Sequence, residues 1–249
     1  MPTHQAVSVA ANHRSRNTAR LRGTVVVLPG RGESAALYER LGDRLAYDGY
    51  DVLVTDLPPL HGIDAAWLDQ AAPPAELTDA ARVTLVGSDS GAVIAALLAS
   101  RWGADSVVLA GIGGIDAAVE RRTDEERIAE RTSCVVHRGR LSADADLSAL
   151  TAQTFRPEIV ERLRALTLTV PVLAVHGADD EITGIGEALR LYGSLSPDIE
   201  LAVVEGGVHD ALNDATHRTV SAELVQFLER KGREPIVRRD ASLVEEVAA

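Results

Sequence analysis

Short runs of β-branched and other apolar residues recur along the chain, separated by longer stretches of helical character. Continuous apolar runs of this kind, bounded by glycine or proline, are typical of strands buried on both faces of a parallel sheet. The alternation indicates an α/β fold of right-handed βαβ units, with a mostly parallel central sheet and helices on both faces. Strands are predicted over residues 25–28, 52–54, 83–86, 107–109, 172–175 and 201–204, and helices over residues 38–47, 92–100, 185–192 and 220–228.

The length and composition indicate one domain. A chain of 249 residues with 46% apolar content can bury a single substantial core. Residues 115–166 carry charged helical sequence without a strong strand signal, which predicts a short helical cap inserted over the sheet. We expect residues 1–22 to form a flexible N-terminal tail, residues 23–231 the domain, and residues 232–249 a peripheral C-terminal tail.

The charge balance limits the classes of partner. A net charge of −12 and an isoelectric point near 5.0 disfavour nucleic acid and anionic membrane surfaces, because the long-range potential repels phosphate. No apolar run approaches the roughly 20 residues of a membrane-spanning helix. Residues 1–22 lack the apolar core of a secretory signal, and the one cysteine, Cys134, cannot form a disulfide within the chain. These features favour a cytoplasmic protein that acts on a small molecule.

The strongest chemical signal is the sequence Gly-Ser-Asp-Ser-Gly at residues 87–91, between a predicted strand and a predicted helix. A strand, a sharp turn and a helix form the nucleophile elbow, in which the central residue is strained. The residues two before and two after the centre must be small, because strand and helix approach closely there. The two glycines make Asp89 the favoured centre, while centring on Ser90 or Ser88 stays open. A glycine-rich loop with Asp89 as helix N-cap is the non-catalytic interpretation.

Two later strand signals are each followed by residues suited to catalysis. Residues 172–175 lead into a loop with Asp179 and Asp180, and residues 201–204 lead into a loop with His209. Ligands of parallel α/β sheets bind beyond the carboxyl ends of the strands, where these loops lie. The order of nucleophile, acid and histidine along the chain is that of a hydrolase triad.

Together with the segment Leu-Pro-Gly-Arg-Gly-Glu-Ser at residues 28–34, these motifs resemble the α/β-hydrolase superfamily, and most closely its monoacylglycerol-lipase and lysophospholipase-like branch. The resemblance implies that Asp180 is the triad acid, with Asp179 as the local alternative, and that His209 is the general base. It also implies that the backbone N–H groups of Arg31 and Ser90 form an oxyanion hole. Neither a metal nor an organic cofactor is expected.

An aspartate at the elbow departs from the serine of most relatives. A carboxylate that attacked an ester carbonyl would form an anhydride, whereas attack on an sp³ carbon gives an ester that activated water can hydrolyse. Asp89 therefore favours epoxide or alkyl-halide substrates. The branches that use such substrates bind the halide or the epoxide oxygen with a Trp after the nucleophile or with Tyr residues of the cap. Here Ser90 follows Asp89, and residues 115–166 contain no Tyr.

The sequence therefore leaves three functions open. The leading one is a hydrolase of a small or medium organic substrate that forms a covalent Asp89 ester, with Asp89, His209 and Asp180 as its triad. The second is a serine-type carboxylic ester hydrolase that uses Ser90, and the third is a catalytically silent, ligand-binding homologue. In the predicted cap, His137 and Arg138 are candidates for contact with substrate or leaving group, although short charge clusters are commonly solvated.

Overall fold

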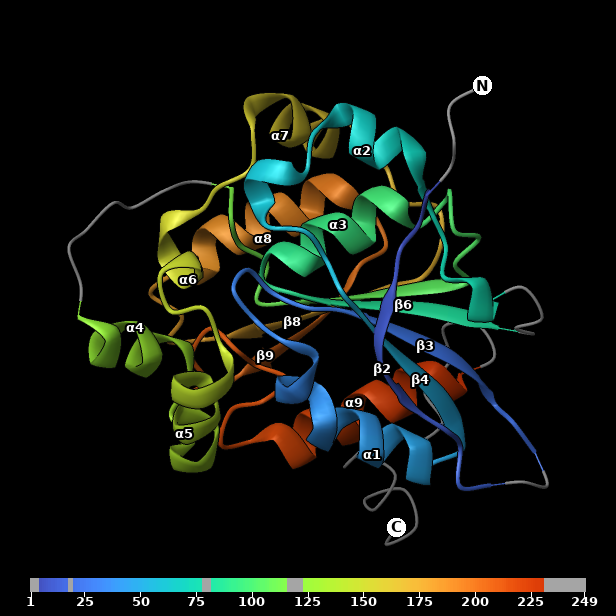
Figure 1. Cartoon of the computed structure of the whole chain (residues 1–249), viewed down its shortest axis with the longest axis horizontal. Helices are drawn as coiled ribbons and strands as arrows, with labels where there is room; N and C mark the ends of the chain where they lie inside the picture. Colours follow the sequence, from blue (N-terminus) through green and yellow to red (C-terminus); the bar gives the residue numbers. More distant parts are fainter. Residues whose placement is uncertain (1–4, 18–19, 78–81, 116–122, 231–249) are drawn as a thin grey trace, which may run out of the picture.

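The computed structural model describes residues 5–17, 20–77, 82–115 and 123–230. A seven-stranded sheet lies at its centre, in the order β2-β4-β3-β6-β7-β8-β9 (Figure 1). All neighbouring strands are parallel except β2 and β4. The mostly parallel sheet predicted from the sequence is thereby confirmed. The strands are β2 (Val9–His13), β3 (Gly23–Leu28), β4 (Tyr50–Thr55), β6 (Val83–Ser88), β7 (Ser106–Ala110), β8 (Val172–Gly177) and β9 (Glu200–Val204).

Helices cover both faces of the sheet (Figure 1). One layer holds α1 (Glu39–Tyr47) and α9 (His217–Glu229), and the other holds α2 (Ala65–Gln70), α3 (Ser90–Leu98) and α8 (Ile185–Leu195). Successive residues of a strand point to opposite faces. In β3, Val25 and Val27 accordingly pack in the core beside α1 and α9, while Val26 and Leu28 pack in the core beside α3. This double burial explains why the central strands are continuous apolar runs.

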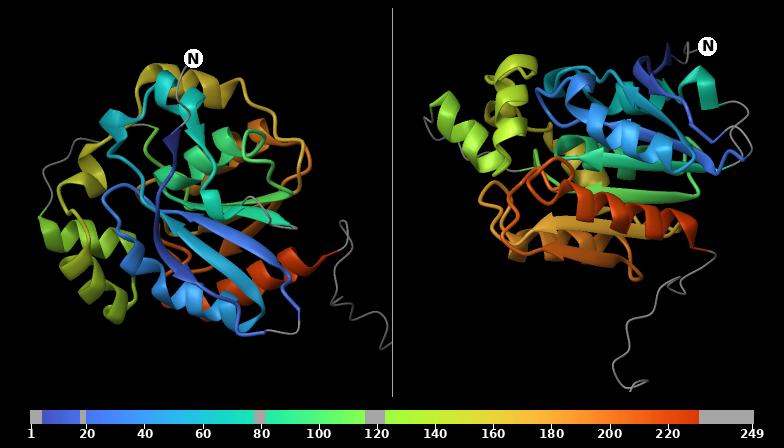
Figure 2. Two further views of the ribbon diagram at one scale, coloured as in Figure 1. Left: turned by 45° about the vertical axis from the view of Figure 1, so that its right-hand side comes forward. Right: turned by 90° about the horizontal axis from the view of Figure 1, so that it is seen from below.

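The predicted cap consists of helices. These are α4 (Asp124–Arg131), α5 (Val135–Asp144), α6 (Ala149–Ala152) and α7 (Pro157–Arg164). Thr123 begins α4 with a capping box, in which its hydroxyl accepts from the Glu126 amide and the Glu126 carboxylate accepts from the Thr123 amide. Figure 2 shows α4 and α5 projecting from one end of the sheet. In contrast, α7 contacts α3 and α8 and belongs to the helical layer.

The N-terminal segment differs from the flexible tail that the sequence indicated. Residues 9–13 form β2, which pairs antiparallel with β4 at the edge of the sheet, and β1 (Gln5–Ala6) pairs with β5 (Ala71–Ala72). The side chains of β2 alternate between half-buried and exposed, so this edge strand lacks the apolar run of a central strand. The predicted peripheral segment 232–249 lies outside the described residues.

The remaining short elements connect the main ones. They are the 3₁₀ helices η1 (Ala35–Tyr38), η2 (Leu60–Gly62) and η3 (Ala75–Leu77). Within the described ranges, no helix has both the length and the apolar character required to cross a bilayer.

Candidate active site

The turn between β6 and α3 has the geometry of a nucleophile elbow centred on Asp89. Asp89 has φ 51° and ψ −120°, and it is the one non-glycine residue with positive φ in the described part of the chain. A Cβ added at Gly87 would overlap the backbone of Gly91, and one added at Gly91 would overlap the carbonyl oxygen of Leu28. The two glycines therefore permit the close approach of strand and helix that holds Asp89 in a strained conformation.

Three side chains from separate loops meet at the carboxyl edge of the sheet. His209 Nε2 lies 3.1 Å from Asp89 Oδ1, and His209 Nδ1 lies 2.8 Å from Asp180 Oδ2. Asp89 and His209 are each 1% exposed, and Asp180 is 5% exposed. The exposed Asp179 makes no hydrogen bond with His209 among the described contacts. The geometry thus favours Asp180 over Asp179 as the partner of the histidine.

Two arginine side chains also bind the Asp89 carboxylate. Arg31 donates from Nε to Oδ2 at 2.9 Å and from Nη2 to Oδ1 at 3.0 Å, and its backbone N–H donates to Oδ2 at 3.1 Å. Arg131 Nη2 adds a contact of 3.3 Å to Oδ2. Oδ2 therefore accepts from three groups, whereas Oδ1 accepts from the Arg31 side chain and His209.

Arg131 reaches Asp89 from the cap. It is the last residue of α4, is fully buried, and pairs through Nη1 with Glu33 Oε1 at 3.1 Å. Because an unpaired buried guanidinium is strongly unfavourable, these contacts anchor the end of α4 over the elbow. The sequence did not identify this residue, since an arginine at the end of a charged helix is most often solvated.

Electrostatics fix the charges of the central pair. Burial alone would raise the pKa of Asp89, but the guanidinium groups of Arg31 and Arg131 outweigh it and hold that pKa well below its usual range. Burial likewise disfavours charge on His209, yet the Asp180 and Asp89 carboxylates raise its pKa to about 9. At neutral pH, Asp89 is therefore ionised and His209 is an imidazolium.

This raised pKa gives a testable pH dependence of stability. The folded-state pKa of about 9 lies above the ordinary value of 6.5, so His209 stabilises the fold fully below pH 6.5 and loses this effect as pH rises through 9. We expect the free energy of unfolding to fall by about 3 kcal/mol over that interval. Urea denaturation at several pH values measures it. A His209→Gln variant should lack this decline, and an undiminished decline in that variant would contradict the assignment.

Of the two backbone amides predicted to form the oxyanion hole, one already has a hydrogen-bond partner within the protein. The Arg31 amide already donates to Asp89 Oδ2, while the Ser90 amide lies at the first residue of α3. Ser90 is 1% exposed as a residue, and its hydroxyl makes no hydrogen bond with any described residue, His209 included. The geometry therefore gives His209 a carboxylate partner at the elbow rather than a serine.

The two cap residues proposed to contact substrate are used within the protein. His137 Nε2 lies 2.5 Å from Asp210 Oδ2, and Arg138 Nε donates to the carbonyl oxygen of Thr132 at 2.9 Å. Neither lines the cavity beside the elbow. His137 and Asp210 are both buried, and buried polar groups need hydrogen-bond partners. Their contact holds α5 against the loop that carries His209.

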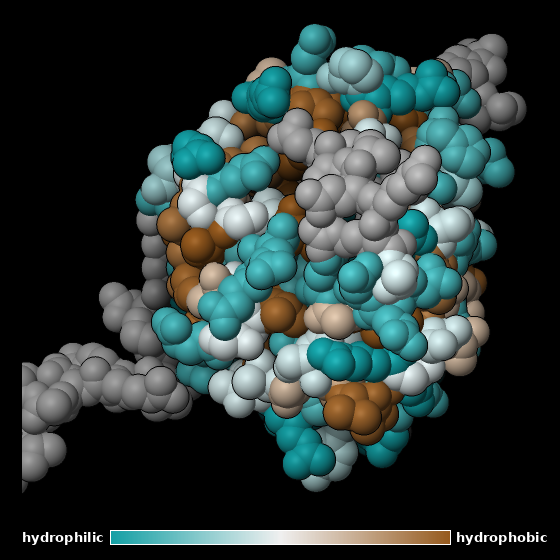
Figure 3. All heavy atoms as spheres, turned by 90° about the vertical axis from the view of Figure 1, so that its left-hand side faces the viewer, coloured by the Kyte–Doolittle hydropathy of each residue, from teal (hydrophilic) through white to brown (hydrophobic). Residues whose placement is uncertain are grey.

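A cavity of about 330 Å³ lies beside the elbow, between the core and the cap. Arg31 and Ser90 line it, while Asp89 does not. Figure 3 views the molecule from the cap side, where hydrophilic residues surround smaller hydrophobic areas. The lining residues are Pro29, Gly30, Arg31, Gly32, Glu33, Ser34, Asp56, Leu57, Pro58, Pro59, Leu60, Ser90, Ile94, Asp144, Asp146, Ala149 and Gln153.

Comparison with known proteins shows distant similarity in sequence. No protein-family model matches the sequence. A monoacylglycerol lipase of Mycolicibacterium smegmatis is 26% identical over 118 residues, which span 47% of this chain and 40% of that lipase. The similarity thus covers less than half of the relative.

Solved structures resemble the chain over most of its length. A monoglyceride lipase of Saccharomyces cerevisiae, crystallised with a substrate analogue, matches with a TM-score of 0.66 and 18% identity, covering 88% of this chain and 90% of the lipase. An esterase of Rhodococcus sp. ECU1013 matches with a TM-score of 0.67 and 19% identity, covering 93% of this chain and all of the esterase (100%). At these identities the likeness establishes the fold.

Proposed function

We propose that this chain, which has the α/β-hydrolase fold, is a hydrolase in which Asp89 attacks an sp³ carbon of a small or medium organic substrate. One observation carries the proposal. Asp89 occupies the strained elbow position, within 3.1 Å of a histidine that is itself bonded to Asp180. Covalent hydrolysis requires this arrangement, in which the nucleophile lies within hydrogen-bond reach of a base and an acid orients that base.

The first step forms an ester. Asp89 Oδ1 bonds to the substrate carbon, and the carbon–oxygen bond of an epoxide or the carbon–halogen bond of an alkyl halide breaks, its electron pair leaving with the oxygen or halogen. Because Arg31 Nη2 and His209 Nε2 both donate to Oδ1, these groups must first move away from Oδ1. The negative charge then passes from Asp89 to the leaving group, and the cationic Arg31 side chain, which lines the cavity, can stabilise it there.

Ester formation also prepares His209 for the second step. Asp89 contributes to the raised pKa of His209 through its charge and its hydrogen bond. Once esterified, Asp89 is neutral, so the pKa of His209 falls toward the range of a general base. In epoxide opening, the imidazolium also gives its proton to the alkoxide. In displacement of a halide, the imidazolium releases its proton to solvent once Asp89 is neutral, and this proton is the acid formed together with the halide ion. In both routes the histidine is therefore neutral when water must be activated.

In the second step, His209 takes a proton from a water that attacks Asp89 Cγ. The tetrahedral oxyanion forms on Oδ2, which already accepts from the Arg31 amide, Arg31 Nε and Arg131 Nη2. Preorganised donors aimed at the developing charge are the main source of rate enhancement in such steps. Collapse breaks the bond from Cγ to Oδ1, which leaves as the hydroxyl oxygen of the product and receives the proton from His209. The water oxygen stays on Cγ, and the acid proton of Asp89 then restores the imidazolium.

Oxygen labelling tests this route. We expect turnover in water enriched in ¹⁸O to leave heavy oxygen in the Asp89 side chain, because solvent attacks Cγ rather than the substrate. Styrene oxide, 1-bromobutane and (2,3-epoxypropyl)trimethylammonium serve as probes, and mass spectrometry of the peptide that contains Asp89 gives the readout. Labelled product with an unshifted peptide mass would rule out covalent catalysis by Asp89.

Adding 4-nitrophenyl acetate to the probes separates the two other functions. An ester hydrolase that used Ser90 would hydrolyse this ester through an acyl intermediate on that serine and leave Asp89 unlabelled. A catalytically silent binding protein is favoured by one observation, namely that Asp89 accepts from five donors and is 1% exposed. Such a protein would turn over none of the probes.

A further inference from the structure

The cavity beside the elbow carries a charge pattern that the proposed reaction does not use. Among the described residues that line it, Arg31 is the sole cation, and Asp89 neutralises that charge. Glu33 also lines the cavity and is paired with Arg131. Three further carboxylates, those of Asp56, Asp144 and Asp146, have no ion pair with any described residue. The cavity mouth is therefore net negative.

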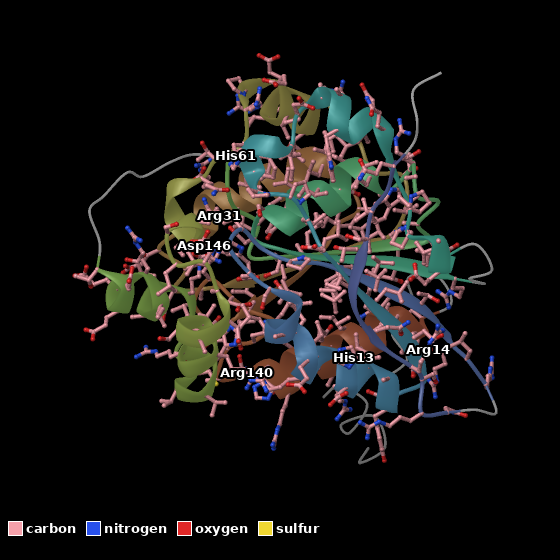
Figure 4. The ribbon with its side chains drawn as sticks, viewed as in Figure 1. His13, Arg14, Arg31, His61, Arg140 and Asp146 are labelled. Carbon is pink, nitrogen blue, oxygen red and sulfur yellow. The ribbon has the colours of Figure 1, made fainter. Side chains whose placement is uncertain are left out.

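These carboxylates face the cavity from two sides. Asp56 directly follows β4 in the core, whereas Asp144 and Asp146 belong to the cap. The cap comes close at this point, because the Asp146 amide donates to the Gly32 carbonyl oxygen at 2.7 Å. Figure 4 shows Asp146 beside Arg31, next to the cap helices. A positive group in the mouth would thus lie between carboxylates of both parts of the molecule.

The position of Asp144 does not serve helix stability. It is the last residue of α5, where the helix dipole presents its negative end. A carboxylate there is unfavourable for the helix, and no cation among the described residues compensates it. Asp146 differs, because its Oδ1 accepts from the Ser148 amide and hydroxyl, which lower its pKa and keep it ionised.

Two unpartnered hydroxyl groups also point to a ligand in the cavity. The Ser90 hydroxyl, on a residue 1% exposed, makes no hydrogen bond with any described residue. The buried Ser34 Oγ likewise has no partner in the described structure. Both residues line the cavity. Because buried polar atoms are rarely left unsatisfied, the Ser34 hydroxyl is available to bond a polar atom of a bound molecule. The Ser90 hydroxyl, which has no partner in the same cavity, is available as well.

The remaining wall is apolar. Leu57, Pro58, Leu60 and Ile94 line the cavity between Asp56 and the elbow. A volume of about 330 Å³ is within the range of small-molecule sites. The cavity therefore combines a negative mouth, an apolar wall and hydrogen-bonding groups next to Asp89.

We propose that the substrate carries an ammonium group, which lies between Asp56 and the cap carboxylates Asp144 and Asp146, while its apolar body packs on the Leu57–Leu60 wall and its reactive end points toward Ser90 and Asp89. The substrate class rests on the proposed function. The preference of the cavity for a cation does not, because it needs no reaction at Asp89.

Choline and its uncharged carbon isostere 3,3-dimethylbutan-1-ol test the charge preference without any reaction. We expect choline to bind the full chain about tenfold more tightly at low ionic strength, as a few carboxylates at a solvated rim would provide. Isothermal titration calorimetry or ligand-detected NMR measures both dissociation constants. Raising the salt to about 1 M should remove most of the difference, because it shortens the Debye length to ~3 Å.

Variants locate the effect. The double variant Asp56→Asn, Asp144→Asn should lose the preference for choline, since both side chains are exposed and their replacement leaves the fold intact. Glu205→Gln, which removes an exposed carboxylate outside the cavity lining, is the matched control and should retain it. Equal binding of the two alcohols, or a choline preference that survives in the double variant, would overturn the inference.

The outcome is distinguishable from that of the proposed function. Preferential choline binding without labelling of Asp89 by any probe would uphold the cation site and defeat covalent catalysis. Labelling of Asp89 by styrene oxide, combined with equal binding of choline and its isostere, would uphold the reaction and defeat the cation site.

If both proposals hold, (2,3-epoxypropyl)trimethylammonium should be turned over with a lower KM than its neutral isostere 1,2-epoxy-4,4-dimethylpentane.

Discussion

Replacing Asp180 with asparagine is expected to slow turnover about 10⁴-fold while leaving the fold intact. Asp180 Oδ2 faces His209 Nδ1 at 2.8 Å, and Oδ1 accepts from the amides of Ile182 and Thr183. An asparagine can keep the backbone contacts through its carbonyl oxygen, but it then turns its NH₂ group toward His209. The histidine is driven to the tautomer with its proton on Nε2 and cannot accept a proton from water. Steady-state rates on any probe that labels Asp89 measure the loss.

Asp179→Asn is the matched control for this prediction. Asp179 precedes Asp180 directly, is exposed, and makes no hydrogen bond with His209 among the described contacts. We expect its replacement to change the rate little. Circular dichroism establishes that both variants are folded. A larger loss of rate in Asp179→Asn than in Asp180→Asn would show that the triad acid is misassigned.

The central fold was predictable because its signals are local. Every predicted strand corresponds to a strand of the sheet. Five of the six are buried on both faces and therefore continuously apolar, whereas β9 is an edge strand whose exposed positions are also apolar, at Leu201 and Val203. The edge strand β2 was missed because its exposed side alternates with a half-buried one. The short helix α2 was missed as well, because its six residues are too few to show a helical period, although Asp64 caps its first turn.

The three central site residues were predictable for a related reason. Asp89 and Asp180 follow buried strands and His209 follows the edge strand β9, and the carboxyl ends of parallel strands share one edge of the sheet. The side-chain roles of Arg31 and Arg131 were not predictable in this way. Arg31 was identified only through its backbone N–H, and Arg131 reaches Asp89 because the cap folds back over the elbow. Such contacts depend on tertiary structure and have no fixed spacing along the chain.

A His209→Gln variant is expected to accumulate the covalent ester on Asp89, with hydrolysis slowed on the order of 10⁶-fold. Glutamine cannot accept a proton from water at neutral pH, so the second step stops, whereas attack by Asp89 on an alkyl bromide requires no proton transfer. Incubation with 1-bromobutane or (2-bromoethyl)trimethylammonium should therefore raise the mass of the intact protein by one alkyl group minus one hydrogen. Mass spectrometry of the intact chain and of the peptide containing Asp89 measures this shift and its site.

The double variant Asp89→Asn, His209→Gln controls for alkylation elsewhere. It retains every other nucleophile, including the thiol of Cys134, which is partly exposed and has a lowered pKa. Burial opposes ionisation of that thiol, but hydrogen bonds from the backbone at His137 and from Arg40 outweigh it. Alkylation of Cys134 would appear equally in both variants, whereas the ester on Asp89 appears only in the single variant. Equal mass gain in the two proteins would show that Asp89 is not the nucleophile, and stoichiometric gain confined to the single variant would establish that the carboxylate leaves its arginine partners to react.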